Sequence, residues 1–280
     1  MDRREALRAR GEGRKQKKLL ESDYLLGVND LTRMETLRFK PEEGERYLTD
    51  QAEHEVPPIA NIRELEQATS KLGNDDFFED EEANKWLIML MASGSSLGGA
   101  GPKANVLDTD DTLWIAKFPS KNDTFDSGAW EYIVNQMAVE LELDVAIGKI
   151  GKSSQNQHTY LTKRFDRTDR LKIHFASAMT LWGYKDGYDH KEGGSYLEIV
   201  ELLERYGSNP NNDIRELWKR IVFSVAISDT DDHLRNHGFL LSPTGWKLSP
   251  AYDINPNIDG IGLNLNISEG DNSLDFDLCM

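Results

Sequence analysis

Cysteine is almost absent from this sequence, because Cys279, next to the C-terminal residue, is the only one. A disulfide needs a second cysteine and a thiolate zinc site needs more, so both are excluded within this chain. The lack of a disulfide framework is typical of a reducing compartment. Long apolar runs are also missing: none approaches the ~18 residues of a membrane-spanning helix.

Positive charge is scarce as well. The chain has 33 Lys and Arg against 49 Asp and Glu, a formal net charge of −16. Nucleic-acid binding draws mainly on basic contacts to phosphates, so we expect no direct contact with DNA or RNA. Basic residues are concentrated in residues 3–18, where a solvated tail or helix and a partner-binding segment both fit the composition. The N-terminal sequence Met-Asp-Arg-Arg-Glu is followed by no apolar stretch, so we expect no secretory signal and a cytoplasmic protein.

The 280 residues, 38% of them hydrophobic, suffice for one large domain or for two lobes with a core. Residues 1–22 are predicted to be a charged tail or helix. In residues 23–168 the patterns predict a short helix or turn and then a strand within 23–39. Helices are predicted at 61–72, from Glu79 to Met91, and from Asp126 or Ser127 onward. Strands are predicted at 103–108, 112–118, 145–150 and 159–165. Residues 169–280 are predicted to be mostly helical, with helices at 174–182, 195–206 and 214–226, a hairpin over 239–248, and an alternating, strand-like pattern at 262–267.

Segment 95–101, Ser-Ser-Leu-Gly-Gly-Ala-Gly, consists of residues with small side chains or none, apart from Leu97, and it precedes a predicted strand. Backbone N–H groups in such a loop can approach an anion closely, as they do in phosphate-binding loops. Pro102 and Lys103 stand where a Walker A loop would have Gly-Lys-Ser/Thr, so the segment is not a Walker A loop. A flexible linker has the same composition, and the segment alone does not discriminate between the two.

A lysine stands at the end of an otherwise apolar strand, Leu113-Trp-Ile-Ala-Lys117. Strand alternation places Leu113, Ile115 and Lys117 on one face. The helix that follows carries Glu131. A strand lysine paired with a glutamate of the following helix holds nucleotide phosphates in protein kinases. An exposed lysine on the solvent face is the ordinary alternative for this pattern.

Acidic and amide side chains are concentrated in residues 227–253, which follow an amphipathic helix and include a predicted hairpin. Phosphoryl transfer needs a carboxylate to accept a hydroxyl proton and oxygen ligands for Mg²⁺. Asp231 suits the first task, and Asn236 and Asp253 suit the second. Turn-forming Asp and Asn in an acidic chain are the structural alternative. A zinc site on the two histidines of this stretch has a possible spacing but lacks suitable further ligands nearby.

The order of these parts is more informative than any one of them. The parts follow one another in the order found in a bilobal protein kinase. They are a glycine loop, a hairpin lysine, a helix glutamate, a hinge strand, helices, an Asp-x-x-x-x-Asn loop and an Asp at the end of a hairpin. We therefore expect an α+β, bilobal protein-kinase-like fold. Residues 23–168 would form a mixed β/α N-lobe with an antiparallel sheet, and residues 169–280 a mostly helical C-lobe.

Several motifs resemble the HipA-type serine/threonine kinases of bacterial toxin–antitoxin systems, over roughly residues 23–260. Segment 96–103, Ser-Leu-Gly-Gly-Ala-Gly-Pro-Lys, looks like the phosphate loop of that family. Lys117 in Ala-Lys-Phe-Pro looks like its ATP-binding lysine, and segment 163–167, Lys-Arg-Phe-Asp-Arg, resembles its hinge. Segment 231–236, Asp-Asp-His-Leu-Arg-Asn, and segment 249–253, Ser-Pro-Ala-Tyr-Asp, are similar to its catalytic and metal-binding motifs.

The resemblance implies a HipA-like fold, ATP and Mg²⁺ as cofactors, and a role for each matched residue. Asp231 would be the catalytic base, Arg235 would lend positive charge, and Ser96 would be autophosphorylated. Asp232 is assigned no role, because the family's His stands two residues after its catalytic Asp. Asn236 and Asp253 would bind the metal. The residues implied to bind the cofactor are Ser96, Gly98, Gly99, Ala100, Gly101, Lys103, Lys117, Lys163, Phe165, His233, Asn236 and Asp253. For His233, a structural role in the catalytic loop fits as well.

The resemblance also implies partners. The target would be an aminoacyl-tRNA synthetase or another translation component, and a small helix-turn-helix antitoxin would bind the chain. Family members usually begin with a β-rich subdomain ahead of the residue that matches Asp23, and they run on past the residue that matches Asp253. Gly101 stands where members often have Arg or Gln. We therefore expect a shortened homologue, or a split system with a separate N-terminal protein. The alternative is an inactive kinase that acts as a module binding a partner.

Overall fold

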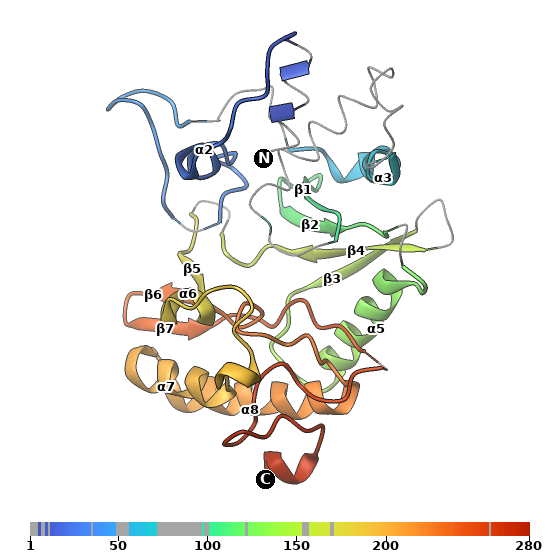
Figure 1. The fold of residues 1–280 in the computed structure, drawn as a ribbon, viewed down its shortest axis with the longest axis vertical. Helices are drawn as coiled ribbons and strands as arrows, with labels where there is room; N and C mark the ends of the chain where they lie inside the picture. The colour runs from blue at the N-terminus through green and yellow to red at the C-terminus, as the bar shows by residue number, and fades with distance from the viewer. Residues whose placement is uncertain are drawn as a thin grey trace. The chain divides into compact units, whose positions relative to one another are not determined.

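A computed structural model describes residues 5–6, 9–10, 12–34, 36–48, 56–71, 97, 101–120, 123–152, 157–168, 171–257 and 259–280. The chain divides into two compact units (Figure 1). The first unit comprises residues 1–128 and 151–164, and the second comprises residues 129–150 and 165–280. The sequence predicted a single boundary between residues 168 and 169, and the chain passes into the second unit for the last time at residue 165. Residues 129–150, which the prediction placed in the N-lobe, belong to the second unit.

The first unit is built on an antiparallel sheet whose two faces differ. Its elements are α2 (Glu21–Leu26), η2 (Ile59–Asn61), α3 (Ile62–Lys71), β1 (Lys103–Leu107), β2 (Leu113–Lys117) and β4 (His158–Lys163). Among the described residues the sheet order is β1-β2-β4-β3, where β3 (Gly148–Lys152) crosses between the units. On one face Val106, Trp114 and Leu161 are buried together with Leu65 of α3. Alternation along the strands places both polar and apolar side chains on the other face, among them Lys117 and the buried Leu113.

The second unit packs helices against a three-stranded antiparallel sheet. Its elements are β5 (Phe175–Ser177), α6 (Ala178–Trp182), η4 (His190–Glu192), α7 (Tyr196–Tyr206), α8 (Pro210–Ile227), β6 (Gly238–Ser242), β7 (Gly245–Leu248) and η5 (Phe276–Cys279). Helices α7 and α8 lie side by side, and both contact β7 (Figure 1). Apolar residues at helical spacing in α7 and α8, such as Ile199, Leu203 and Leu217, form the core between these layers.

Helix α5 (Ser127–Glu140) begins in the first unit and continues into the second. Val134 and Ala138 pack against Phe223 of α8, which explains why most of α5 belongs to the second unit. The apolar residues of this segment extend beyond the face that is buried. Four of them are about half exposed: Trp130, Ile133, Met137 and Leu141.

Most predicted elements are confirmed, and three are corrected. Residues 175–177 form strand β5 and not the start of a helix, because they pair with β6. Residues 262–267 form no strand: the chain bends repeatedly there, makes one isolated bridge from Asn266 to Ser195, and buries Leu263 and Leu265 in the core. The described part of 27–39 contains no strand either. The helix predicted from Glu79 to Met91 lies outside the described residues.

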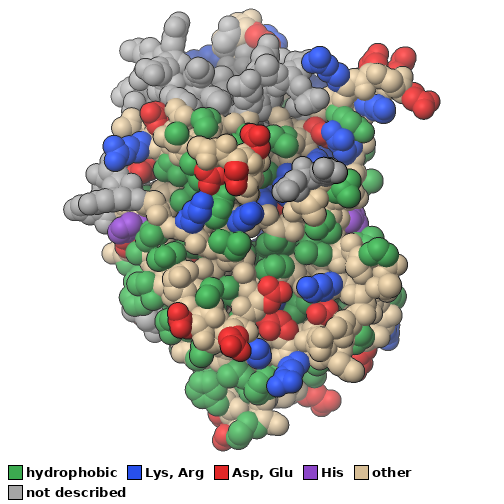
Figure 2. Space-filling model, turned by 180° about the vertical axis from the view of Figure 1, so that it is seen from behind, with side chains coloured by type: hydrophobic (Ala, Val, Ile, Leu, Met, Phe, Trp, Pro, Cys, Tyr) green, Lys and Arg blue, Asp and Glu red, His purple; other side chains and the backbone are tan. Residues whose placement is uncertain are grey.

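The surface carries mixed charge. On the face in Figure 2, acidic and hydrophobic side chains are interspersed, and the basic side chains of the coloured residues are scattered over it. No helix in the described part of the chain is long and apolar enough to cross a membrane.

Candidate active site

The candidate site begins where α8 ends. Ser228 adopts a left-handed conformation with φ 55°, and its N–H bonds back to the carbonyls of Ser224 and Val225. The N–H of Asp229 donates to Ser224 O at 2.9 Å. Such left-handed caps end a helix abruptly. The chain therefore turns at once into the loop of residues 229–236.

Neighbouring side chains of this loop point in different directions. Asp231 is exposed, whereas Asp232 is 6% and Leu234 1% exposed. The loop also folds back on itself: Asn236 N–H donates to His233 O at 2.8 Å, and Asn236 Nδ2 donates to Asp231 O at 3.2 Å. The Asp231 carboxylate, predicted to be the base, is thus exposed. The Asn236 side chain bonds across the same loop to the Asp231 carbonyl.

The segment after β7 is bonded to both ends of this loop. Tyr252 Oη donates to Arg235 O at 2.6 Å, and Asn255 N–H donates to Asp229 Oδ2 at 3.2 Å. Asp253 lies between these contacts and has a φ of 60°, which is uncommon for a residue other than Gly. Surrounding contacts must hold such a conformation, and functional sites are where it recurs. The two predicted metal ligands, Asn236 and Asp253, are therefore on segments that lie together.

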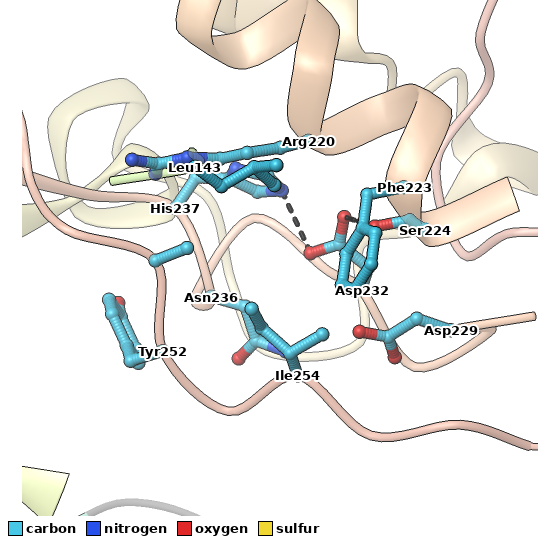
Figure 3. Close-up of a pocket in the computed structure, with 11 residues that line it drawn as sticks. Leu143, Arg220, Phe223, Ser224, Asp229, Asp232, Asn236, His237, Tyr252 and Ile254 are labelled. Carbon is cyan, nitrogen blue, oxygen red and sulfur yellow. Dashed lines mark hydrogen bonds and ion pairs between the residues drawn. The ribbon is translucent and has the colours of Figure 1, made fainter. Parts of the chain in front are cut away.

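A small cavity of about 20 Å³ lies behind the loop, enough for about one water molecule (Figure 3). Its lining residues are Leu143, Arg220, Phe223, Ser224, Asp229, Asp232, Asn236, His237, Ala251, Tyr252 and Ile254. Asp229 is 2% exposed, and its Oδ1 has no hydrogen-bond partner among the described residues. Burial and then the charge of Asp232 raise the pKa of Asp229 to about 9, so its carboxyl group is protonated at neutral pH.

Asp232 is the centre of a buried polar network. Its Oδ2 accepts hydrogen bonds from Tyr196 Oη at 2.7 Å and from Ser224 Oγ at 3.3 Å. His237 Nε2 lies 2.9 Å from its Oδ1 (Figure 3). Burial by itself raises the pKa of Asp232, but the charge and contact of His237 and the bond from Tyr196 outweigh this and lower it. Asp232 is thus an ionised buried group between α7, α8 and β6.

Arg220 of α8 supports the other side of the site. Its Nη2 donates to Asp144 O at 3.0 Å and to Ser249 O at 2.8 Å, and its Nε donates to Glu216 Oε1 at 3.1 Å. The N–H of Ala251 donates to the same Asp144 carbonyl at 2.8 Å. Because Arg220 is 5% exposed, these acceptors replace the water that it loses. The segment leading to Asp253 is fixed in this way.

Arg235 was predicted to lend positive charge near the transferred group. Its Nη1 lies 2.5 Å from Asp186 Oδ1, and its Nη2 lies 3.0 Å from His233 Nε2. A guanidinium can only donate, so His233 accepts through Nε2 in this arrangement. His233 therefore orients Arg235, which fits the structural role that the sequence left open for it.

Phe165 packs within the second unit. Its ring centroid lies 6.1 Å from Phe175 and 5.6 Å from Tyr252, and the last two rings are 6.2 Å apart. Aromatic rings at these distances and tilts attract one another. Phe165 thereby supports Tyr252, whose hydroxyl binds the catalytic loop. Its predicted contact with a cofactor remains a prediction.

The predicted lysines all belong to the first unit. The register pairs Lys103 directly with Lys117 across β1 and β2, so both lie on the same face of the sheet. Lys117 Nζ lies 5.8 Å from the ring centroid of Tyr160 on the same face. Lys163 pairs with Trp114, so alternation places it on the opposite face. The sheet therefore brings Lys103 and Lys117 together and separates Lys163 from them.

Other predicted residues remain untested. Ser96, Gly98, Gly99 and Ala100 lie outside the described residues, and of the segment 95–101 the structure describes Leu97 and Gly101. Glu131 is 6% exposed in the part of α5 that belongs to the second unit. Its pairing with Lys117 of the first unit stays a prediction.

Sequence reasoning missed the buried groups behind the loop. Asp232 had been assigned no role, yet it is the residue that joins the loop to three elements. Its donors Tyr196 and Ser224, and Arg220 nearby, were missed altogether. Spacing does not reveal them, because Tyr196 and Asp232 are 36 positions apart in the chain.

The residues present fit Mg²⁺ better than zinc. Within the described ranges, no three His, Cys, Asp or Glu side chains gather to hold a metal ion. Asn236 and Asp253 offer amide and carboxylate oxygens, the ligand type that Mg²⁺ accepts with help from substrate phosphates. This donor set suits a cation that has few protein ligands and whose remaining coordination positions are taken by nucleotide phosphates.

Comparison with known proteins identifies the family. Residues 95–278 match the family described as "HipA-like C-terminal domain". A protein of Haemophilus influenzae named "Putative kinase" is 25% identical over 179 residues, which cover 57% of this chain and 52% of that protein. "Putative kinase Y4dM" of Sinorhizobium fredii is 29% identical over 153 residues, which cover 50% of this chain and 36% of that protein. The chain thus matches about half the length, or less, of these curated relatives.

Solved structures are similar too, among them the toxin–antitoxin system of Shewanella oneidensis MR-1, with HipA, HipB and operator DNA. The likeness has a TM-score of 0.53 at 20% identity, and it covers 63% of this chain and 48% of that one. At that identity it bears on the fold alone. It agrees with an α+β fold that has antiparallel sheets.

Proposed function

The chain belongs to the HipA-like C-terminal domain family, and from this premise we propose that it is an ATP- and Mg²⁺-dependent protein serine/threonine kinase. One observation carries the proposal. The loop with Asp231 and Asn236 is bonded at both ends to the segment with Asp253. A base and two oxygen ligands on adjoining segments are what phosphoryl transfer requires.

Each residue has a chemical task under this proposal. Asp231, exposed on the loop, accepts the proton of the attacking serine or threonine hydroxyl. Asn236 and Asp253 hold Mg²⁺, which when bound neutralises charge on the nucleotide phosphates. Arg235 adds positive charge near the transferred group. Lys103 and Lys117 point from one face of their sheet, as suits two cations that bind a polyphosphate.

The decisive test is transfer of label from radiolabelled ATP in the presence of Mg²⁺. Wild type should label itself or an added protein, and Asp231→Asn should not. EDTA should abolish labelling of wild type. If wild type incorporates no more label than Asp231→Asn, the kinase proposal fails. ATP binding by calorimetry without any transfer would instead favour an inactive kinase that serves as a binding module.

Regulation and partners extend the proposal. Phosphorylation of Ser96 would place a doubly charged group in the glycine loop and repel the phosphates of ATP. Phosphopeptide mapping after incubation with ATP tests this, and label found only elsewhere would refute it. The solved HipA is accompanied by HipB and operator DNA. We propose a small helix-turn-helix antitoxin as the partner here and an aminoacyl-tRNA synthetase as the target. Pull-down and target-labelling experiments test these two assignments.

A further inference from the structure

The catalytic loop has few backbone bonds of its own to the helices behind it. Asp229 N–H bonds to the end of α8, whereas Asp232 N–H and Asn236 N–H bond to carbonyls within the loop. The second half of the loop is held by Leu234, whose carbonyl accepts from Met179 N–H of α6 at 3.3 Å and whose side chain is buried in the core. In residues 230–233, before Leu234, the buried contacts to the surrounding elements are made by the Asp232 side chain.

The partners of Asp232 come from three different places in the second unit. Tyr196 is the first residue of α7, Ser224 lies in the last turn of α8, and His237 immediately precedes β6. The Tyr196 and His237 rings meet edge to face, with centroids 5.5 Å apart and an interplanar angle of 90°. The carboxylate is therefore held from both oxygens, and two of the groups that hold it also pack against each other.

The neighbours of Asp232 are the residues that the proposed reaction needs. Asp231 and His233 flank it, and the peptide geometry fixes adjacent Cα atoms at about 3.8 Å. With Asp232 facing inward, Asp231 faces outward, and Asn236 Nδ2 then reaches the Asp231 carbonyl. A carboxylate anchored at Asp232 thus sets the position of the base Asp231.

A purely stabilising role explains this network poorly. Taking an ionised carboxylate out of water costs several kcal/mol, and replacing such groups by apolar ones is often neutral or stabilising. What a fully bonded buried carboxylate supplies instead is one defined geometry. Here that geometry fixes the backbone at Asp232 and so the direction of the adjacent Asp231 side chain.

We infer that Asp232 is a positioning residue for phosphoryl transfer: held by Tyr196, Ser224 and His237, it sets the orientation of Asp231. The inference rests on the proposed kinase function. It predicts that loosening the network slows the transfer step and leaves nucleotide binding intact. A displacement of about 1 Å at a reacting group can reduce a rate on the order of 100-fold.

The test compares two tyrosines that each donate to a carboxylate in the second unit. Tyr196→Phe removes the bond to Asp232, while Tyr184→Phe removes the 2.6 Å bond to Glu198 of α7, which is not one of the groups that contact Asp232. Asp232→Asn is measured alongside. We expect kcat to fall ~10- to 100-fold in Tyr196→Phe and Asp232→Asn, with the KM for ATP within about twofold of wild type. Tyr184→Phe should keep the wild-type kcat even where its melting temperature falls.

A merely structural role predicts a different outcome. Both tyrosine variants would then lose stability, and each would keep the wild-type kcat per folded molecule. That result overturns the inference, as does a loss of ATP affinity equal to the loss of rate. Because Tyr196→Phe changes so little volume, it remains informative even if Asp232→Asn does not fold.

Amide hydrogen exchange separates this inference from the kinase proposal. If wild type transfers no phosphate, the kinase proposal has failed, and exchange of residues 229–237 then decides whether Asp232 fixes the loop. We expect at least tenfold faster exchange there in Tyr196→Phe and no change in Tyr184→Phe. Equal exchange in wild type and Tyr196→Phe overturns the positioning role whether or not the protein is a kinase.

Discussion

Asp229 should make the stability of this protein fall as pH rises. The ordinary pKa of its carboxyl group is 3.8, and in the folded chain burial and the charge of Asp232 raise it to about 9. Between these values the folded chain keeps a proton that the unfolded chain has lost. The free energy of unfolding therefore decreases with increasing pH, by up to about 1.4 kcal/mol per pH unit.

The test is Asp229→Asn, which keeps an oxygen for the Asn255 N–H but has no titrating proton. From pH 5 to pH 8 the contribution of the Asp229 carboxyl group amounts to roughly 4 kcal/mol, and the variant, whose amide does not titrate, would not show it. We therefore expect the variant to gain stability relative to wild type across this interval. Asp232 does not mask the effect, because its pKa is lowered and its own contribution is lost only below about pH 4.

Urea unfolding followed by tryptophan fluorescence at several pH values measures this difference. Asp259→Asn is the matched control, because Asp259 is an exposed aspartate of the same unit. Its stability should run parallel to wild type from pH 5 to pH 8. If Asp229→Asn also runs parallel to wild type, the carboxyl group of Asp229 is not held protonated, and the described environment of the cavity is wrong.

Three further predictions concern stability. Arg220→Met removes the cation that is paired with the Glu216 carboxylate and the donor to Ser249 O. Because a buried ion pair is broken, the free energy of unfolding should fall by about 3–5 kcal/mol in urea denaturation, and a drop below about 1 kcal/mol would contradict the network. Leu217→Ala, at a position 1% exposed, should cost about 2–5 kcal/mol by the same measurement, unlike an exposed-site change such as Leu197→Ala. Gly238→Ala should lower the melting temperature strongly, because the new Cβ would lie 2.3 Å from the Phe175 ring. Gly183→Ala, where no atom lies within 4 Å but φ is +72°, should cost only about 1 kcal/mol, and equal effects would refute the steric argument.

Local patterns were sufficient for most elements. The periodicity of 195–206 and 214–226 predicted α7 and α8, and alternation predicted β1 and β2 close to their observed bounds. Local patterns failed where long-range pairing decides the conformation. Residues 175–177 read as helical by themselves, but β6 supplies backbone partners that make them a strand.

The same division applies to the candidate site. Residue type and order were enough to predict roles for Asp231, Asn236 and Asp253, because proton transfer and Mg²⁺ binding demand particular side chains. They could not identify Tyr196 or Ser224, since a hydroxyl that bonds to a buried carboxylate has no distinctive spacing. The role of Lys163 also depended on register, which places it on the face opposite Lys117.

The sequence by itself therefore determined the chemistry available to this protein and the order of its parts. Only the tertiary structure decided which of two adjacent aspartates faces outward. Asp231 and Asp232 are the same residue type, and no local propensity separates them. Tyr196, Ser224 and His237 hold Asp232 inside the second unit, and the chain then turns Asp231 outward. A buried charge persists only where such partners converge, and that convergence is a property of the folded chain.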